Sequence, residues 1–192
     1  NLFLGGKIHM NIFEKSGAKW IWTHECEYDD VNQYAEFRHE FSLDDITDAE
    51  AKLYISADTD YAVWINGNFI NCNQYDDYPE HKIFDILSID GVLKKGLNIL
   101  CVLVYYQGES SFQYIKGQPG VIYVLETKRK KIISNSEVRC RKSPGYLNGP
   151  IAKISPQLSF TFEYDARGDD SWLSDDYCYD KSWGIASIQK NS

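Results

Sequence analysis

The segment Tyr61-Ala62-Val63-Trp64-Ile65-Asn66-Gly67 joins a run of strand-forming residues to the strongest short turn signal in the chain. Asn and Gly tolerate the positive φ angles that a tight hairpin turn requires. The turn Asp58-Thr59-Asp60 separates this run from an alternating stretch at residues 51–57. The segment therefore predicts a β-hairpin with a further strand on its N-terminal side.

Apolar and polar residues alternate in several other parts of the chain. In residues 35–43 every second residue shares one face, namely Ala35, Phe37, His39, Phe41 and Leu43. Residues 51–57 and 158–164 show the same period of two, which is typical of half-buried strands. The continuous apolar run Ile99–Tyr106 predicts a central strand covered on both faces. Short strands separated by turns predict an all-β fold, an antiparallel jelly-roll β-sandwich.

Composition and charge exclude several classes of function. The 192 residues carry a net charge of −8, and such a surface repels a phosphate backbone, so we expect no nucleic-acid partner. The single basic run, Lys128–Lys131, is interpreted as a solvated hairpin turn. No stretch of apolar residues is long enough to span a membrane. The five Cys residues include no C-x-x-C pair, which argues against a disulfide framework and a zinc site. These features favour a reducing, cytoplasmic setting and leave secretion open.

A change in composition near Asp165 suggests a domain boundary. Five aspartates crowd around Trp172 and Trp183 in the stretch that follows. We predict an N-terminal extension at residues 1–17, a sandwich at 18–165, and a linker with the start of a following β-sandwich at 166–192. If that next domain is a separate unit, apolar surface near the two tryptophans should be exposed.

Several segments, taken in order, resemble the N-terminal sandwich of bacterial α-L-rhamnosidases, the glycoside hydrolases of family 78. They are Ala18–Trp22, Phe37–Leu43, Ala57–Gly67 with its W-I-N-G hairpin, Asp85–Asn98 with its L-x-x-G-x-N strand, Tyr164–Arg167, and Trp172–Trp183. The hairpin and the L-x-x-G-x-N strand also resemble the sugar-binding jelly roll of family 2 β-galactosidases. The order of the pieces and the Y-D-A-R and D-K-S-W motifs favour the rhamnosidase resemblance.

The resemblance implies a galactose-binding-domain-like fold, with later β-sandwiches and a catalytic (α/α) barrel in the same polypeptide as partners. In the family the catalytic carboxylates belong to the later barrel, so no residue of this chain corresponds to them. We therefore expect a non-catalytic accessory domain with a structural role and saccharide binding as a further candidate role. A stand-alone carbohydrate-binding module and a free-standing catalytic domain are the alternatives. The latter would depend on Asp76, Asp77 and Glu80, and neighbouring loop acids rarely hold the geometry that glycoside hydrolysis requires.

Two loops contain residue types that suit a sugar. Planar polar groups can hydrogen-bond to hydroxyls, and aromatic rings can stack on the C–H groups of a pyranose. Residues of both kinds follow the hairpin and the long apolar strand, in loops predicted at one end of the sandwich. The candidate ligands for rhamnose or another saccharide are Gln74, Tyr75, Asp76, Tyr78, Tyr106 and Gln107.

A metal site is the remaining candidate. Relatives with the implied fold often hold a structural Ca²⁺, and Asp58 and Asp60 are oxygen donors in one tight turn. The D-x-D-x-D-G calcium signature is absent, and an aspartate in a turn usually caps its own backbone. Calcium is the only cofactor that the sequence suggests. His39 is interpreted as a satisfied core residue rather than a ligand.

Overall fold

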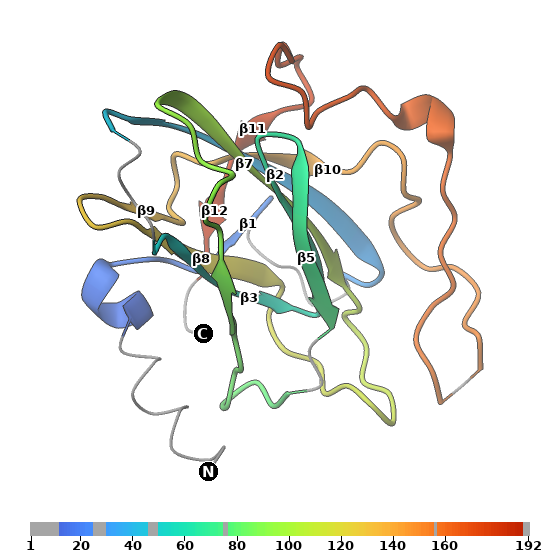
Figure 1. The fold of residues 1–192 in the computed structure, drawn as a ribbon. Coiled ribbons are helices and arrows are strands. Elements are labelled where there is room, and N and C mark those ends of the chain that lie inside the picture. Colours follow the sequence, from blue (N-terminus) through green and yellow to red (C-terminus); the bar gives the residue numbers. More distant parts are fainter. Residues whose placement is uncertain (1–11, 25–29, 46–49, 75–76, 156, 190–192) are drawn as a thin grey trace.

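The computed structural model describes residues 12–24, 30–45, 50–74, 77–155 and 157–189, which form two antiparallel sheets packed face to face (Figure 1). The first sheet has the order β12-β1-β8-β3-β6, with β9 paired to β8; the second has the order β11-β10-β2-β7-β4-β5. The predicted antiparallel β-sandwich is confirmed.

The first sheet contains β1 (Ile21–Trp22), β3 (Lys52–Asp58), β6 (Asp85–Ser88), β8 (Gly120–Glu126), β9 (Lys131–Ile133) and β12 (Ser187–Ile188). The second contains β2 (Gln33–Leu43), β4 (Asp60–Ile65), β5 (Asn68–Gln74), β7 (Gly96–Tyr106), β10 (Arg139–Lys142) and β11 (Gly184–Ile185). A short helical turn at residues 12–16 and the 3₁₀ helix η1 (Ala166–Gly168) are the helices of the described chain. None of its helices has the length and apolar character needed to cross a membrane.

The centre of the second sheet is the pair β2 and β7. The two strands run in register from Gln33 opposite Tyr106 to Leu43 opposite Gly96. Because side chains alternate along a strand, Phe37 and Phe41 point into the core, while Glu36 and Arg38 lie on the outer face. The predicted alternation in residues 35–43 and the predicted central strand Ile99–Tyr106 are both confirmed.

The Asn66-Gly67 turn joins β4 to β5 as predicted. Asn66 has φ 51° and Gly67 has φ 76°, the left-handed values that this kind of turn requires. The Asn66 side chain also receives a hydrogen bond from Ile99 N at 3.0 Å and donates to Val92 O at 2.9 Å. The turn is therefore fastened to β7 as well as to its own hairpin. The basic run Lys128–Lys131 lies at the turn between β8 and β9, again as predicted.

The predicted strand at residues 158–164 is wrong. Only isolated bridges form there, between Lys153 and Phe160 and between Tyr146 and Tyr164. Phe162 is 68% exposed, and its ring packs against Tyr146 at 6.3 Å between centroids. These alternating residues contact the preceding loop, at Tyr146 and Lys153, instead of a partner strand. The period of two therefore does not produce a ladder of hydrogen bonds between strands.

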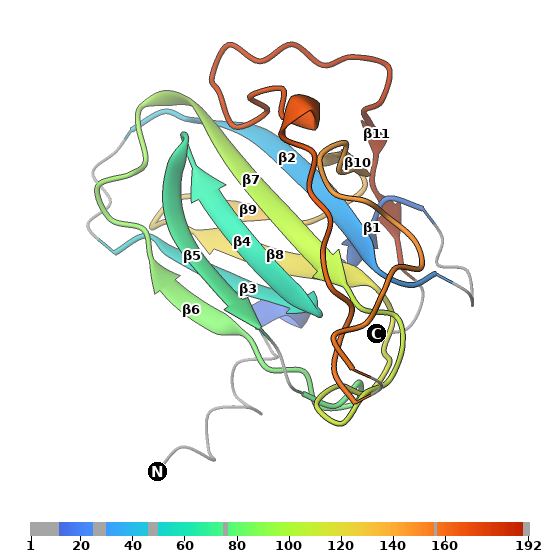
Figure 2. The same cartoon turned by 90° about the vertical axis from the view of Figure 1, so that its right-hand side faces the viewer.

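The C-terminal segment, residues 166–189, is part of the sandwich. Strand β11 pairs with β10 in the second sheet, and β12 pairs with β1 in the first. Figure 2 shows the segment, in orange to red, passing along the outer side of the second sheet. Trp172 and Trp183 are only 8% and 7% exposed. The segment folds back and buries both rings. The expected exposed apolar surface near them is present at Ile185, which is 60% exposed. How the full-length protein divides into domains stays a prediction.

Candidate functional site

A pocket of about 380 Å³ opens at one end of the sandwich, and we call it the end pocket. Residues of the loop after β5 and of the loop after β7 line it. These two loops meet at the bottom of Figure 2. Asp58, the last residue of β3, forms part of its wall together with Trp20, which precedes β1. Its full lining is Trp20, Asp58, Pro79, Lys82, Lys116, Gly117 and Gln118.

A buried ion network forms the polar wall of the end pocket. Lys82 Nζ lies 3.1 Å from Asp58 Oδ2 and 2.6 Å from Asp77 Oδ1. The three side chains are 9%, 3% and 5% exposed, respectively. Burial raises the pKa of the Asp58 carboxyl, while Lys82 and a hydrogen bond from Tyr114 act in the opposite direction. A buried ion pair seldom adds stability compared with apolar packing, so this network at the wall of a pocket favours a functional role.

Aromatic residues beneath the pocket hold the loop after β7 in place. Tyr114 donates to Asp58 Oδ1 at 2.6 Å and accepts from Gly117 N at 3.1 Å, and Tyr106 donates to Gly117 O at 2.9 Å. A Cβ at position 117 would overlap the Asp58 carboxylate, so only glycine allows this close approach. The loop after β7 is therefore held directly against the ion network.

The end pocket has the chemistry of a site for a small hydroxylated ligand. The Lys82 ammonium lies 6.0 Å from the centre of the Trp20 ring, so charged and aromatic groups share the lining. Such a combination suits a sugar, whose hydroxyls need polar partners and whose C–H faces need apolar ones. Both carboxylates bind the same ammonium, however. Asp58 and Asp77 are therefore not arranged as the facing acid and base that hydrolysis of a glycoside requires.

The six predicted sugar-binding residues have different outcomes. Tyr75 and Asp76 lie outside the described residues. Gln74 is the last residue of β5, opposite Asp60. Tyr78 is 59% exposed near the pocket loop, where its carbonyl accepts from His81 N.

Tyr106 and Gln107 do not fit the predicted sugar-binding role. Tyr106 is completely buried in the core, so its ring cannot stack on a ligand. Gln107 is also buried, and its amide Nε2 donates to Glu109 O at 2.7 Å. Both residues support the loop rather than line the pocket. Sequence reasoning missed Trp20 and Lys82, which lie in other segments of the chain and share no local motif with Asp58.

The two aspartates proposed for calcium have different surroundings. The Lys82 ammonium occupies the position beside Asp58 Oδ2 that a cation would need, so Asp58 does not suit a metal. Asp60 Oδ1 is buried and has no hydrogen-bond partner among the described residues. The described chain brings no three His, Cys, Asp or Glu residues together as a metal site. Calcium at this turn stays a prediction that these contacts do not support.

His39 is a satisfied core residue, as predicted. Its Nδ1 lies 2.8 Å from the Tyr123 hydroxyl. Burial lowers the pKa of His39 to about 4, so the imidazole is neutral in the folded protein at neutral pH.

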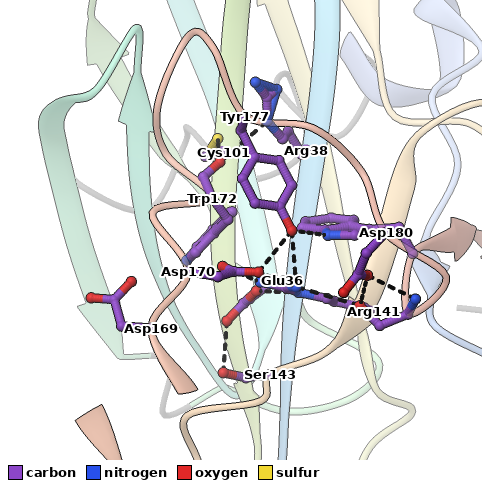
Figure 3. Close-up of polar contacts among 12 residues, drawn as sticks. Glu36, Arg38, Cys101, Arg141, Ser143, Asp169, Asp170, Trp172, Tyr177 and Asp180 are labelled. Carbon is purple, nitrogen blue, oxygen red and sulfur yellow. Dashed lines mark hydrogen bonds and ion pairs between the residues drawn. The ribbon is translucent and has the colours of Figure 1, made fainter. Parts of the chain in front are cut away.

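A second polar group, which we call the Arg141 cluster, lies on the outer face of the second sheet (Figure 3). Arg141 is 2% exposed and donates from Nε to Glu36 Oε2 at 2.7 Å. Its two terminal nitrogens donate to the two oxygens of Asp170, each at 2.7 Å. The Trp183 ring lies 4.5 Å from the guanidinium carbon. Ser143 Oγ donates to the other Glu36 oxygen at 2.7 Å, so the buried carboxylate is fully engaged.

The Arg141 cluster attaches the C-terminal segment to the sheet. Tyr177 donates to Asp170 at 2.7 Å and accepts from Trp183 Nε1 at the same distance. On the neighbouring part of β2, Arg38 donates to the carbonyls of Trp172 and Ser174 at 3.2 and 2.9 Å. Each donor nitrogen of these two arginines binds a group within the chain, which indicates a structural role rather than a binding site.

Solved structures identify the class of protein to which this architecture corresponds. Known protein families and curated proteins give no match to the chain. The rhamnosidase of glycoside hydrolase family 78 from Bacillus sp. GL1 matches with a TM-score of 0.76 and 27% identity, over 89% of this chain and 18% of that one. The α-L-rhamnosidase from Dictyoglumus thermophilum matches with a TM-score of 0.68 and 19% identity, over 93% of this chain and 22% of that one.

These matches define a β-sandwich of the kind found as one part of much larger glycoside hydrolases. The resemblance to family 78 α-L-rhamnosidases is therefore confirmed, and the chain spans about a fifth of the length of these enzymes. A lectin from Pleurotus ostreatus, solved with GalNAc, matches with a TM-score of 0.53 and 12% identity over 91% of this chain and 43% of the lectin. That likeness shows the shared sandwich fold alone.

Proposed function

We propose that this chain is the non-catalytic N-terminal accessory domain of an α-L-rhamnosidase-like glycoside hydrolase. The observation that carries the proposal is the match at 27% identity over 89% of this chain to only 18% of a family 78 rhamnosidase. A domain in that position packs against later domains of the same polypeptide and stabilises them. The rhamnosidase activity would then belong to the parent protein, on residues outside this sandwich.

The side-chain chemistry supports a non-catalytic role. Of the described carboxylates in the end pocket and the Arg141 cluster, each buried one is bound to a lysine or an arginine. A glycosidase needs two carboxyl groups held about 5 Å or about 6.5–9.5 Å apart across a sugar, with one of them free to donate a proton. Carboxylates fixed by cations do not meet that requirement.

The test is an assay of the purified chain with p-nitrophenyl α-L-rhamnopyranoside. We expect no release of nitrophenol above the buffer blank. Turnover by the chain that disappears in Asp58→Asn would overturn the proposal. In a parent protein, deletion of this sandwich should lower the melting temperature of the remainder, and an unchanged melting temperature would contradict the structural role.

A second candidate function is saccharide binding at the end pocket. The observation in its favour is the meeting of Trp20, Lys82 and Asp58 in one pocket of about 380 Å³, toward the small end of the range for ligand sites, roughly 300–1,000 Å³. Titration with methyl glycosides, followed by amide chemical shifts, should show saturable changes confined to the pocket loops. Lys116→Gln should weaken them. The matched control is Lys95→Gln, which should leave the chemical-shift changes unaltered. Lys95 is an exposed lysine directly before the start of β7, whereas the pocket loop follows the end of that strand.

A further inference from the structure

We propose that a crevice on the outer face of the second sheet binds small quaternary ammonium compounds. The crevice has a volume of about 170 Å³, and we call it the aromatic crevice. Trp64 of β4 forms part of its floor, Tyr146 and Tyr164 reach it from the loop after β10, and Trp172 belongs to the C-terminal segment. It shares no lining residue with the end pocket, so the two sites can be tested separately.

The aromatic rings of the crevice are fixed by packing within the chain. Tyr146 stacks on Tyr34 of β2, with 4.2 Å between ring centres and 10° between ring planes, and it contacts Tyr164 at 4.7 Å. Trp64 and Trp172 meet edge to face at 6.1 Å. Rings that are already in position lose little conformational freedom when a ligand binds. The lining is therefore organised before a ligand arrives.

The charged side chains that line the crevice are acidic. Of the described residues, Glu36 and Asp169 contribute carboxylates to the lining, and no lysine or arginine lies there. Asp169 Oδ1 accepts from Ser171 N at 3.1 Å, and its carboxylate forms no ion pair with a described residue. In Figure 3 Asp169 lies apart from the Arg141 cluster. The crevice thus has one free carboxylate at its exposed edge.

Neighbouring arginines do not offset this charge. Arg141 lies between Glu36 and Asp170, so these three side chains together carry one net negative charge. Arg167, which is close in sequence to the lining, binds the carboxylate of Asp165. The charge nearest the crevice is therefore negative, and it attracts a cation.

The hydrogen-bonding groups on the floor favour a cation that has no N–H donors. Glu36 Oε2 accepts from Arg141 and Oε1 accepts from Ser143, each at 2.7 Å. A primary ammonium has three N–H donors, which need acceptors in place of water. A quaternary ammonium needs none, because it presents methyl groups that pack on aromatic rings while the rings attract its charge. A volume below the roughly 300–1,000 Å³ of most ligand sites suits such a compact head group.

The experiment compares choline with 3,3-dimethylbutan-1-ol, which has the same shape but carries a carbon atom in place of the charged nitrogen. Each is titrated into the intact chain at neutral pH and constant ionic strength and followed by amide and indole N–H chemical shifts. We expect choline to cause saturable shifts at Trp64, Trp172 and Tyr164. The neutral alcohol should bind roughly tenfold more weakly, because it lacks the attraction between the cation and the rings. Ethanolamine, a primary ammonium, should also bind more weakly than choline.

An aspartate variant tests the contribution of charge. Asp169→Asn removes the free carboxylate and keeps an oxygen that can accept from Ser171 N. Choline affinity should fall severalfold in this variant, and the affinity for the neutral alcohol should not change. The matched control is Asp176→Asn, which removes the same charge from the same segment at a residue outside the crevice. It should leave both affinities unaltered.

A tyrosine pair tests the contribution of the rings. Tyr164 is 46% exposed, so its replacement leaves the core of the sandwich intact. Tyr164→Leu keeps apolar surface but removes the aromatic face, and the preference for choline over the neutral alcohol should fall severalfold. Tyr164→Phe keeps the ring and should retain the preference.

Three results would overturn the inference. They are the absence of saturable choline shifts at the residues that line the crevice, equal affinity for choline and the neutral alcohol, and an equal loss of choline affinity in Asp169→Asn and Asp176→Asn. The last would mean that choline responds to general surface charge. If Asp169→Asn does not fold, the comparison of choline with the alcohol on the unaltered chain still decides.

Discussion

Replacing Asp60 by asparagine should stabilise the protein at alkaline pH and have no such effect at acid pH. Asp60 begins β4, and its Oδ1 is buried with no hydrogen-bond partner in the described part of the chain. Burial, with a smaller contribution from the charge of Asp58, raises the pKa of Asp60 from 3.8 to about 7. The folded protein therefore disfavours the charged form of this side chain.

The size and sign of the effect follow from proton linkage. The folded state holds its proton on Asp60 more tightly than the unfolded state does, so between pH 4 and 7 folding takes up a proton. Stability is thus unaffected below the unfolded pKa and falls as the pH rises through this window. A shift of about three pKa units corresponds to about 4 kcal/mol of lost stability above pH 7. The asparagine amide, once buried, costs about 1–3 kcal/mol. The net gain at pH 8 should therefore be roughly 1–3 kcal/mol.

Urea unfolding of the wild type and Asp60→Asn at pH 8 and pH 4.5 measures this difference. The melting temperature should rise by roughly 2–4 °C for each kcal/mol gained. Glu163→Gln, which removes an exposed carboxylate, serves as the control and should change little at either pH. A loss of stability at pH 8, or a gain of the same size at both pH values, would refute the reasoning.

Three further variants test other parts of the sandwich. His39→Gln should flatten the acid limb of the stability profile: the pKa of His39 is about 4 when folded and 6.5 when unfolded, so up to about 3 kcal/mol is lost as the pH falls through that window. A profile that this substitution leaves unchanged between pH 4 and 6.5 would contradict the burial of a neutral imidazole at position 39. Arg141→Met leaves Glu36 buried without its cation and should cost about 3–5 kcal/mol in urea unfolding. Addition of Glu36→Gln should recover part of that loss, and a fully additive double variant would argue against the pair. Trp183→Ala should cost about 3–5 kcal/mol and increase proteolysis after residue 166, whereas a cost under about 1 kcal/mol would show that the ring is not a packing anchor.

The strands could be predicted from the sequence where both the pattern and the turn are local. Residues 35–43 alternate and the Asn66-Gly67 turn closes its own hairpin, so neither depends on distant residues. Residues 158–164 alternate just as clearly but find no partner strand, and a strand without a partner does not form a ladder. The alternation of side chains along β7 also predicts which of its residues are buried. Val102, Val104 and Tyr106 share the inward face, which explains why the last of them is buried.

The end pocket could not have been predicted in the same way. The sequence suggests Asp58 as a metal ligand, whereas its partner in the structure is Lys82, 24 residues away in sequence. Trp20 lies directly before β1, far from Asp58 in sequence. Only the pairing of the sheets brings these residues together. The burial of Trp172 has a similar cause, because its carbonyl partner Arg38 is 134 residues away.

The return of the C-terminal segment to the first strand has a consequence for synthesis on the ribosome. Strand β1 gains its outer neighbour only when β12 arrives, and Gln189 Nε2 then donates to His24 O, 165 residues earlier. Contacts between residues so far apart form late, since a long loop must close first. A nascent chain that has not yet released its last two strands would expose one edge of each sheet. The sandwich is therefore completed only after β12 has been translated.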